Sequence, residues 1–259
     1  MTEQVLYRKY RPQTFGDVVG QEHVTSLLQS ALRLNRVAHA YLFSGPRGTG
    51  KTTVARLLAK AANCEKQKNG EPCNTCDVCK AFGSGVSLDL IEIDAASSRG
   101  IDEIRELREA VRLAPAGARY KAYIIDEVHM LTKEAFNALL KTLEEPPAHA
   151  IFILATTELE KVPETIISRC QHYEFRKIST PVIMSRLAEL AKREKISADK
   201  DALRLLSLFS DGGLRDAESM LGQVIAGREK LTADDVRLVL GAPKEEQVLG
   251  FLEALLAKN

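Results

Sequence analysis

The sequence predicts an α/β fold in which a parallel sheet flanked by helices is followed by a small all-α domain. Between residues 40 and 175, short β-branched runs alternate with helical patterns, as in a parallel sheet covered by helices. After Arg176 only helical patterns remain, with apolar residues three or four positions apart. The 259 residues suffice for two domains, since a domain typically has about 100 to 200 residues.

The first half contains four clear strand patterns and three helical ones. We expect strands at 40–44, 88–94, 120–126 and 150–156, with a short fifth at 173–175. We expect helices at 53–63, 102–113 and 132–143. Pro146 and Pro147 end the last of these, because proline lacks the amide proton that a helix interior needs.

The second half begins with Thr180 and Pro181, which are typical of a helix N-cap followed by proline in the first turn. Helices are expected at 181–193, 200–210, 214–226 and 232–240. We therefore predict an α/β domain at 1–177, a helical domain at 178–242, and the start of a further, truncated domain at 243–259.

Composition narrows the possible partners and location. Hydrophobic residues make up 45% of the chain, but no stretch approaches the roughly 18 apolar residues of a membrane span. The N-terminus lacks the apolar run of a signal peptide, which predicts a cytoplasmic protein with reduced cysteines. A net charge of +1 gives no general attraction to nucleic acid, so any DNA contact must be local.

Residues 45–52 read GPRGTGKT and match the phosphate-binding motif G-x-x-x-x-G-K-[ST], between a predicted strand and a predicted helix. Backbone N–H groups of the loop and the helix N-terminus would hold phosphate. Lys51 would reach the β- and γ-phosphates, and Thr52 would bind Mg²⁺. The expected nucleotide-binding residues here are Gly45, Pro46, Arg47, Gly48, Thr49, Gly50, Lys51, Thr52 and Thr53.

An acidic pair, Asp126 and Glu127, ends the predicted strand 120–126, at the edge where parallel sheets bind ligands. By itself such a pair is usually a solvated turn. Together with the phosphate-binding loop, it predicts that Asp126 holds Mg²⁺ and Glu127 orients the attacking water. For the nearby His129, a packing or supporting role is favoured over chemistry.

Four cysteines, Cys64, Cys73, Cys76 and Cys79, form the pattern C-x8-C-x2-C-x2-C in a polar segment. Four thiolates match a closed tetrahedral Zn²⁺ site, which leaves no open position for a reacting water. We therefore predict a structural zinc module at about 64–79. Cys170 lies outside the pattern and is expected to be a buried thiol.

With these motifs the chain resembles the bacterial DNA polymerase III gamma/tau family of clamp-loader ATPases, which are AAA+ proteins. The similar segments are YRPQTF at 10–15, VGQEH at 19–23, IEIDAAS at 91–97, LLKTLEEPP at 139–147 and SRC at 168–170. The resemblance covers essentially the whole chain. It implies an AAA+ P-loop parallel sheet flanked by helices, with a zinc-binding insertion, followed by a small all-α lid domain.

The resemblance also implies further site residues. Thr157 corresponds to sensor 1, Arg215 to sensor 2, and Arg169 to the arginine finger that enters the neighbouring subunit's ATP site. From composition alone, either arginine would more often be a surface salt-bridge former. The family residues that pack around adenine and ribose correspond to Tyr7, Arg11, Val18 and Val19.

The resemblance also implies a DNA contact for Arg99, which precedes the predicted helix 102–113, and for Arg105, which lies on that helix. The alternative is a solvated helix of mixed charge, because Glu103, Glu106 and Glu109 also lie on it.

The implied function is an ATP-hydrolysing motor that opens a sliding clamp and loads it onto primed DNA, using ATP, Mg²⁺ and Zn²⁺. The implied partners are the delta and delta-prime subunits, further gamma/tau copies, the clamp and primed-template DNA, with no membrane. Two alternatives remain: a non-hydrolysing scaffold subunit, which the intact motifs oppose, and a helicase-type motor acting on branched DNA, which the cysteine insertion and the SRC segment disfavour.

Overall fold

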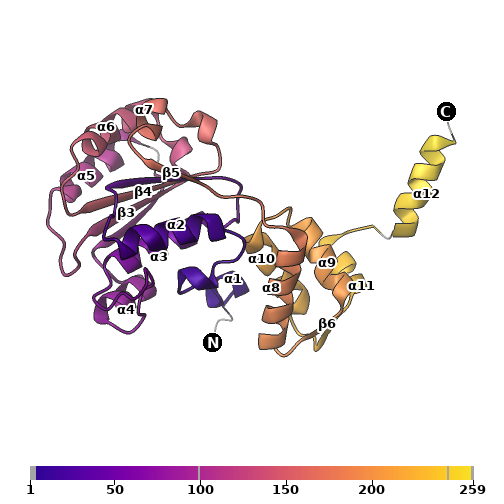
Figure 1. Ribbon diagram of the computed structural model, residues 1–259. Helices are drawn as coiled ribbons and strands as arrows, with labels where there is room; N and C mark the ends of the chain where they lie inside the picture. The colour runs from indigo at the N-terminus through magenta and orange to yellow at the C-terminus, as the bar shows by residue number, and fades with distance from the viewer. Residues whose placement is uncertain (1–3, 99, 244, 258–259) are drawn as a thin grey trace. The chain divides into compact units, whose positions relative to one another are not determined.

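The computed structural model describes residues 4–98, 100–243 and 245–257. These form two compact units, shown in Figure 1. The sheet unit comprises Arg11–Lys177, and the helical unit comprises the described residues up to Tyr10 and those from Ile178 onward.

A five-stranded parallel sheet with the strand order β2-β3-β4-β1-β5 organises the sheet unit. The strands are β1 (Ala40–Ser44), β2 (Leu90–Asp94), β3 (Lys121–Asp126), β4 (Ala150–Thr156) and β5 (Gln171–Glu174). Every residue of β1 and β4 is buried, as expected for parallel strands covered on both faces. All five predicted strands are present, with shifts of up to two residues at their ends.

Helices cover both faces of this sheet. They are α2 (Glu22–Arg33), α3 (Lys51–Ala62), α4 (Asp77–Ser84), α5 (Ile101–Val111), α6 (Lys133–Glu144) and α7 (Glu164–Ile167), with 3-10 turns η1 (Phe15–Asp17), η2 (Val128–Met130) and η3 (Leu159–Lys161). Figure 1 shows α5 and α6 on one face, and α2 and α3 on the other. The sequence patterns did not predict α2, α4 or α7.

Alternation along the strands divides the core of the sheet unit in two. Tyr41 and Phe43 of β1 pack into the core beneath α2 and α3, whereas Leu42 packs into the core beneath α5 and α6. Successive side chains of a strand point to opposite faces, so one apolar strand supplies both cores. The central strands β1 and β4 are thus packed on both faces, and their carboxyl ends are held between the two cores.

The helical unit contains α1 (Leu6–Lys9), α8 (Thr180–Arg193), α9 (Lys200–Phe209), α10 (Leu214–Ile225), α11 (Ala233–Leu240) and α12 (Glu245–Leu256). Its core includes Leu187, Leu206 and Leu221 from three of these helices. The fold class predicted from the sequence is therefore confirmed. One detail was wrong: strands do not cease after Arg176, because β6 (Ser197–Ala198) and β7 (Lys230–Leu231) form a parallel pair. With two residues each, these strands are too short to show a pattern of alternating apolar and polar residues in the sequence.

Leu6 of α1 explains why the first residues group with the helical unit, although the sequence analysis assigned them to domain 1–177. Leu6 is buried in the helical core. Arg186 of α8 donates to the Tyr10 carbonyl at 3.1 Å, and Lys9 forms an ion pair with Glu194 at 2.6 Å.

At the other end of the chain, α12 exposes Phe251 and Leu252. Among the described residues, none of the helices combines the length and the apolarity needed to cross a membrane.

Candidate nucleotide and metal sites

The phosphate-binding loop joins β1 to the first residue of α3, where free N–H groups and the helix dipole favour an anion. Gly45 has φ = 132°, and a Cβ built on it would lie 2.2 Å from the Phe175 carbonyl oxygen. Only glycine allows the loop to pass this close to the chain after β5.

Lys51 is buried at the start of α3 and points back into the loop. Its Nζ donates to the carbonyl oxygens of Gly45 at 2.7 Å and Pro46 at 2.8 Å. Burial lowers the pKa of the Lys51 ammonium, and the carboxylates of Glu127 and Asp126 oppose that shift. The loop thus places a cation close to the acidic pair at the end of β3.

Asp126 is the last residue of β3, and its carboxylate faces the start of α3. The Thr52 hydroxyl donates to Asp126 Oδ2 at 2.7 Å, and the Glu127 amide donates to Oδ1 at 3.0 Å. A hydroxyl and a carboxylate oxygen in contact are the hard ligands that Mg²⁺ prefers. These two residues therefore fit the predicted magnesium site.

Glu127 turns the chain at the end of β3 with φ = 48° and ψ = 45°, a left-handed conformation that is uncommon outside glycine. Thr157, which follows β4, donates its hydroxyl to Glu127 Oε2 at 3.0 Å. Strands β3, β4 and β1 are neighbours in the sheet, so their carboxyl ends bring Glu127, Thr157 and the phosphate-binding loop to one edge.

Arg169 follows α7, and its side chain contacts residues of the sheet unit, to which it belongs. Its Nη2 lies 2.7 Å from Glu144 Oε1, its Nη1 donates to the Thr165 carbonyl at 2.7 Å, and its side chain is 35% exposed. These contacts hold both ends of the Arg169 guanidinium, so its orientation is fixed although the side chain is partly exposed.

The remaining nucleotide-side residues divide between the units. Tyr7 and Arg215 belong to the helical unit, where the Arg215 guanidinium lies 4.7 Å from the centroid of the Tyr7 ring. A hydrogen bond from Arg215 lowers the pKa of the Tyr7 phenol. Arg11, Val18 and Val19 belong to the sheet unit, and Val18 is buried in the core beneath α2.

The four cysteines lie together, with all Sγ atoms within 4.8 Å of one another. Sulfurs around a tetrahedral Zn²⁺ with bonds of about 2.3 Å are about 3.8 Å apart, and Cys73 Sγ and Cys79 Sγ are 3.9 Å apart. The Cys76 amide approaches Cys73 Sγ at 3.3 Å, and the Cys79 amide approaches Cys76 Sγ at 3.4 Å. Such N–H donors stabilise thiolates, so the residues fit zinc.

The cysteine module is tied to the segment before α2. Glu71 Oε2 accepts from the Phe15 amide at 2.8 Å, and Oε1 accepts from the Gly16 amide at 2.9 Å. Buried Lys60 donates to the Gln13 carbonyl at 2.9 Å and to Asn74 Oδ1 at 2.7 Å. The sequence analysis did not identify these contacts, because residues far apart in the chain make them.

Of the two predicted DNA contacts, Arg99 lies outside the described residues. Arg105 is exposed on α5, which also exposes Glu106 and Glu109.

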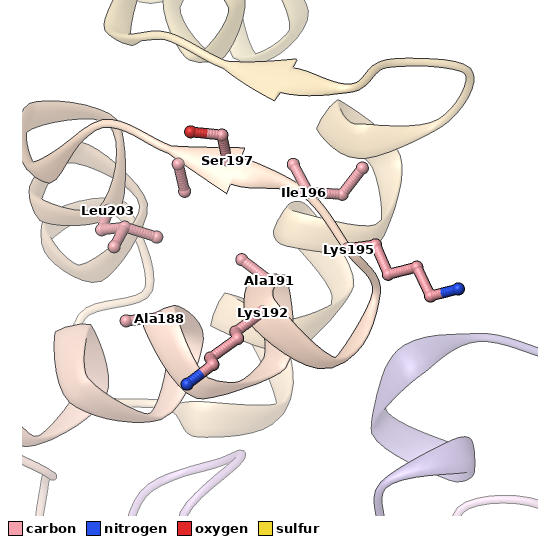
Figure 2. A pocket seen from close by; sticks show the side chains of 8 residues that line it. Ala188, Ala191, Lys192, Lys195, Ile196, Ser197 and Leu203 are labelled. Atoms are coloured by element: carbon pink, nitrogen blue, oxygen red, sulfur yellow. The ribbon is translucent and has the colours of Figure 1, made fainter.

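A pocket of about 390 Å³ lies in the helical unit, lined by Ala188, Ile196 and Leu203 among others, and it contains none of the predicted site residues (Figure 2).

Comparisons with known families place both units in one group of proteins. Residues 20–179 match the family described as DNA polymerase III, delta subunit. Residues 182–229 match the DNA polymerase III clamp loader subunit, ATPase lid domain.

Curated relatives match along the whole chain. DNA polymerase III subunit tau of Bacillus subtilis is 51% identical, and that of Escherichia coli is 48% identical; the chain spans 46% and 40% of their lengths. DNA polymerase III subunit gamma of Buchnera aphidicola subsp. Baizongia pistaciae is 44% identical, and the chain covers 70% of it.

Among solved structures, the Thermotoga maritima RuvB Holliday junction branch migration motor aligns with a TM-score of 0.66. The alignment covers 91% of this chain and 76% of that one, at 18% identity. At this identity the likeness concerns the fold alone.

Proposed function

Because the chain belongs to the DNA polymerase III gamma/tau family, we propose that it is an ATP-hydrolysing motor subunit of the clamp loader. Its fold is of the AAA+ type, with a helical lid. The observation that carries the proposal is the meeting of the phosphate-binding loop, the acidic pair and Thr157 at one sheet edge.

In this proposal each group at that edge has a separate role. The loop residues 45–53 bind the triphosphate through backbone N–H groups, and Lys51 exchanges its two carbonyl partners for phosphate oxygens. Thr52 and Asp126 hold Mg²⁺, which neutralises charge on the β- and γ-phosphates when bound. Glu127 orients the attacking water, and Thr157 senses the γ-phosphate.

The adenine side is assigned to Tyr7, Arg11, Val18 and Val19, with Arg215 as sensor 2. The stacking of Arg215 on Tyr7 supports the assignment of these two residues to one function. The domain limits proposed are 1–177, of which residues 4–10 pack with the helical unit, with the zinc module at about 64–79, 178–242 for the lid and 243–259 for the start of a further domain. The zinc is structural, because four thiolates complete its coordination.

Arg169 is proposed to act on the ATP site of a neighbouring copy or partner subunit. Its Glu144 contact leaves it partly exposed, as a group that works across an interface must be. Delta, delta-prime and further gamma/tau copies are the proposed neighbours, and the assembly opens a sliding clamp and loads it onto primed DNA in the cytoplasm. Arg99 and Arg105 are proposed to contact the DNA backbone.

The test is ATP hydrolysis by the full-length chain assembled with its partner subunits, with and without clamp and primed DNA. Arg169→Ala should reduce the stimulated rate by about 10³- to 10⁵-fold, the usual effect of an arginine finger. Arg36→Ala, at an exposed arginine of the same unit, is the matched control and should leave the rate unchanged.

Two other outcomes favour the alternatives. Full clamp loading with no hydrolysis by this chain indicates a scaffold subunit. High activity of the lone chain, indifferent to clamp and to Arg169, indicates a different motor. Strand separation without partners then points to a helicase.

A further inference from the structure

His129 of η2 has a buried side chain to which the proposed mechanism gives no role. Its side chain is 5% exposed and lies between the ends of β3 and β4. Nδ1 is 3.0 Å from Thr156 Oγ1 and 3.4 Å from Glu127 Oε2. Nε2 is 3.1 Å from Glu158 Oε1. One imidazole ring therefore contacts the water-orienting carboxylate of Glu127 and also Thr156 and Glu158, the residues before and after Thr157 in the chain.

The hydrogen bonds around the ring form a consistent set. An ionised carboxylate only accepts, so Nε2 donates to Glu158. Thr156 Oγ1 accepts from the Glu158 amide at 3.0 Å, which leaves its own proton for Nδ1. Nδ1 is thereby anchored to Thr156, the fully buried last residue of β4, and Nε2 to Glu158, two residues after that strand. The ring edge that faces Glu127 is thus fixed in place.

Glu127 depends on this anchored segment for its orientation. Its backbone is left-handed, and its Oε2 receives the Thr157 hydroxyl at 3.0 Å. A hydroxyl has one proton, so Thr157 cannot donate to Glu127 and to a phosphate oxygen together. When Thr157 turns to the γ-phosphate, Glu127 loses that donor. The imidazole edge then limits where the carboxylate can move.

We propose that His129 is a positioning residue for hydrolysis, which aligns the Glu127 carboxylate with the end of β4 that carries Thr157. Nucleotide sensing at β4 is thereby coupled to water activation at β3. This inference rests on the proposed ATPase function. It assigns His129 an effect on the rate of hydrolysis and not on nucleotide affinity, because within the described part of the chain its polar contacts go to Thr156, Glu127 and Glu158 rather than to the phosphate-binding loop or the Mg²⁺ ligands.

The test compares His129→Ala, His129→Asn and His129→Gln in the full chain within the assembled complex. An asparagine amide takes approximately the place of Nδ1, whereas a glutamine amide takes the place of Nε2. Single-turnover hydrolysis at saturating ATP gives the rate, and a fluorescent ATP analogue gives the affinity. His149→Gln is the control, because His149 bonds the Val111 carbonyl at 3.0 Å just before β4, at the end of that strand opposite Thr156.

We expect His129→Ala and His129→Gln to lose about 10- to 100-fold in rate, as misplaced reacting groups do, with affinity within about 2-fold of wild type. His129→Asn should recover most of the rate, and His149→Gln should match wild type. A wild-type rate in His129→Ala, equal losses of rate and affinity, or His129→Asn no better than His129→Ala would each overturn the inference.

Glu127→Gln separates this inference from the proposed function. If Glu127→Gln is inactive while His129→Ala is fully active, only the inference fails. If wild type hydrolyses ATP no faster than Glu127→Gln, the proposed function fails and the inference falls with it.

Discussion

At the scale of single residues, Gly45 and Gly50 separate two reasons for glycine in the phosphate-binding loop. Both have positive φ, but an added Cβ at Gly45 would meet the Phe175 backbone, whereas at Gly50 it would meet nothing within 4 Å. Backbone strain alone costs about 1–3 kcal/mol. The clash at Gly45 adds to that cost, because the backbone after β5 has to move.

We therefore expect Gly50→Ala to lower the free energy of unfolding by about 1–3 kcal/mol and Gly45→Ala to lower it by more. Denaturant unfolding of the two variants, followed by a probe in the sheet unit, provides the comparison. Equal losses in the two variants would show that the Phe175 contact does not limit the loop.

Glu218 predicts a pH dependence of the helical unit. Burial raises the pKa of Glu218 from 4.5 to about 7, and Arg186, whose Nε is 3.5 Å from Oε1, opposes that shift only in part. Between these pH values the folded state keeps a proton that the unfolded state has lost. The contribution is full below pH 4.5 and is lost as the pH rises to about 7.

The loss in stability over this window should be about 3 kcal/mol, since each pKa unit corresponds to about 1.4 kcal/mol. Glu218→Gln should remove this slope, whereas Glu229→Gln, at an exposed position of the same unit, should retain it. Unfolding midpoints measured from pH 4.5 to 7.5 test this. The explanation is wrong if Glu218→Gln and wild type show the same slope.

At the scale of elements, the cysteine module holds the segment before α2 in place through hydrogen bonds. Glu71 accepts the Phe15 and Gly16 amides and also the Gln29 side chain at 2.7 Å. Both amides approach different oxygens of one carboxylate. A glutamine side chain has a single acceptor oxygen, so it would leave one of these donors facing an NH2 group.

Glu71→Gln should therefore cost about 0.5–1.5 kcal/mol, the usual net value of one hydrogen bond, because the Gly16 amide is exposed and the Phe15 amide is only partly buried. The Phe15 and Gly16 amides should exchange hydrogen faster, and Glu65→Gln, at an exposed position of the same module, should leave their exchange unchanged. Unaltered exchange in Glu71→Gln would mean that this segment holds its place without the module.

At the scale of the whole molecule, the two units have separate cores. Two apolar clusters belong to the sheet unit and a third belongs to the helical unit. The cysteine module lies wholly in the sheet unit. Removal of its metal should therefore weaken one unit and spare the other.

We expect chelation to lower the midpoint of the sheet unit's thermal transition, by about 2–4 °C for each kcal/mol lost in a unit of this size. The helical unit's transition should remain, and it should respond to Glu218→Gln instead. Calorimetry of the zinc-loaded and chelated chain tests this. A parallel fall in both transitions would contradict independent units.

The sequence by itself determined the features that rest on short-range patterns. The strand β4, which is apolar up to its last residue Thr156, was predicted with its observed limits, because burial on both faces requires a nearly continuous apolar run. The phosphate-binding loop and the cysteine cluster could likewise be recognised from the sequence, since their chemistry depends on residue types at fixed spacings. The helix predicted at 132–143 similarly lies within one residue of α6 at both ends, and Thr132 is its side-chain N-cap.

Only the tertiary structure decided how distant segments meet. The contact of His129 with Glu158, that of Glu71 with Phe15 and the burial of Leu6 in the helical core each join residues far apart along the chain. The physical reason is that sheet order and packing, which no local period encodes, set these distances. Periodicity determines which face of an element is buried, whereas only the folded chain determines what lies against it.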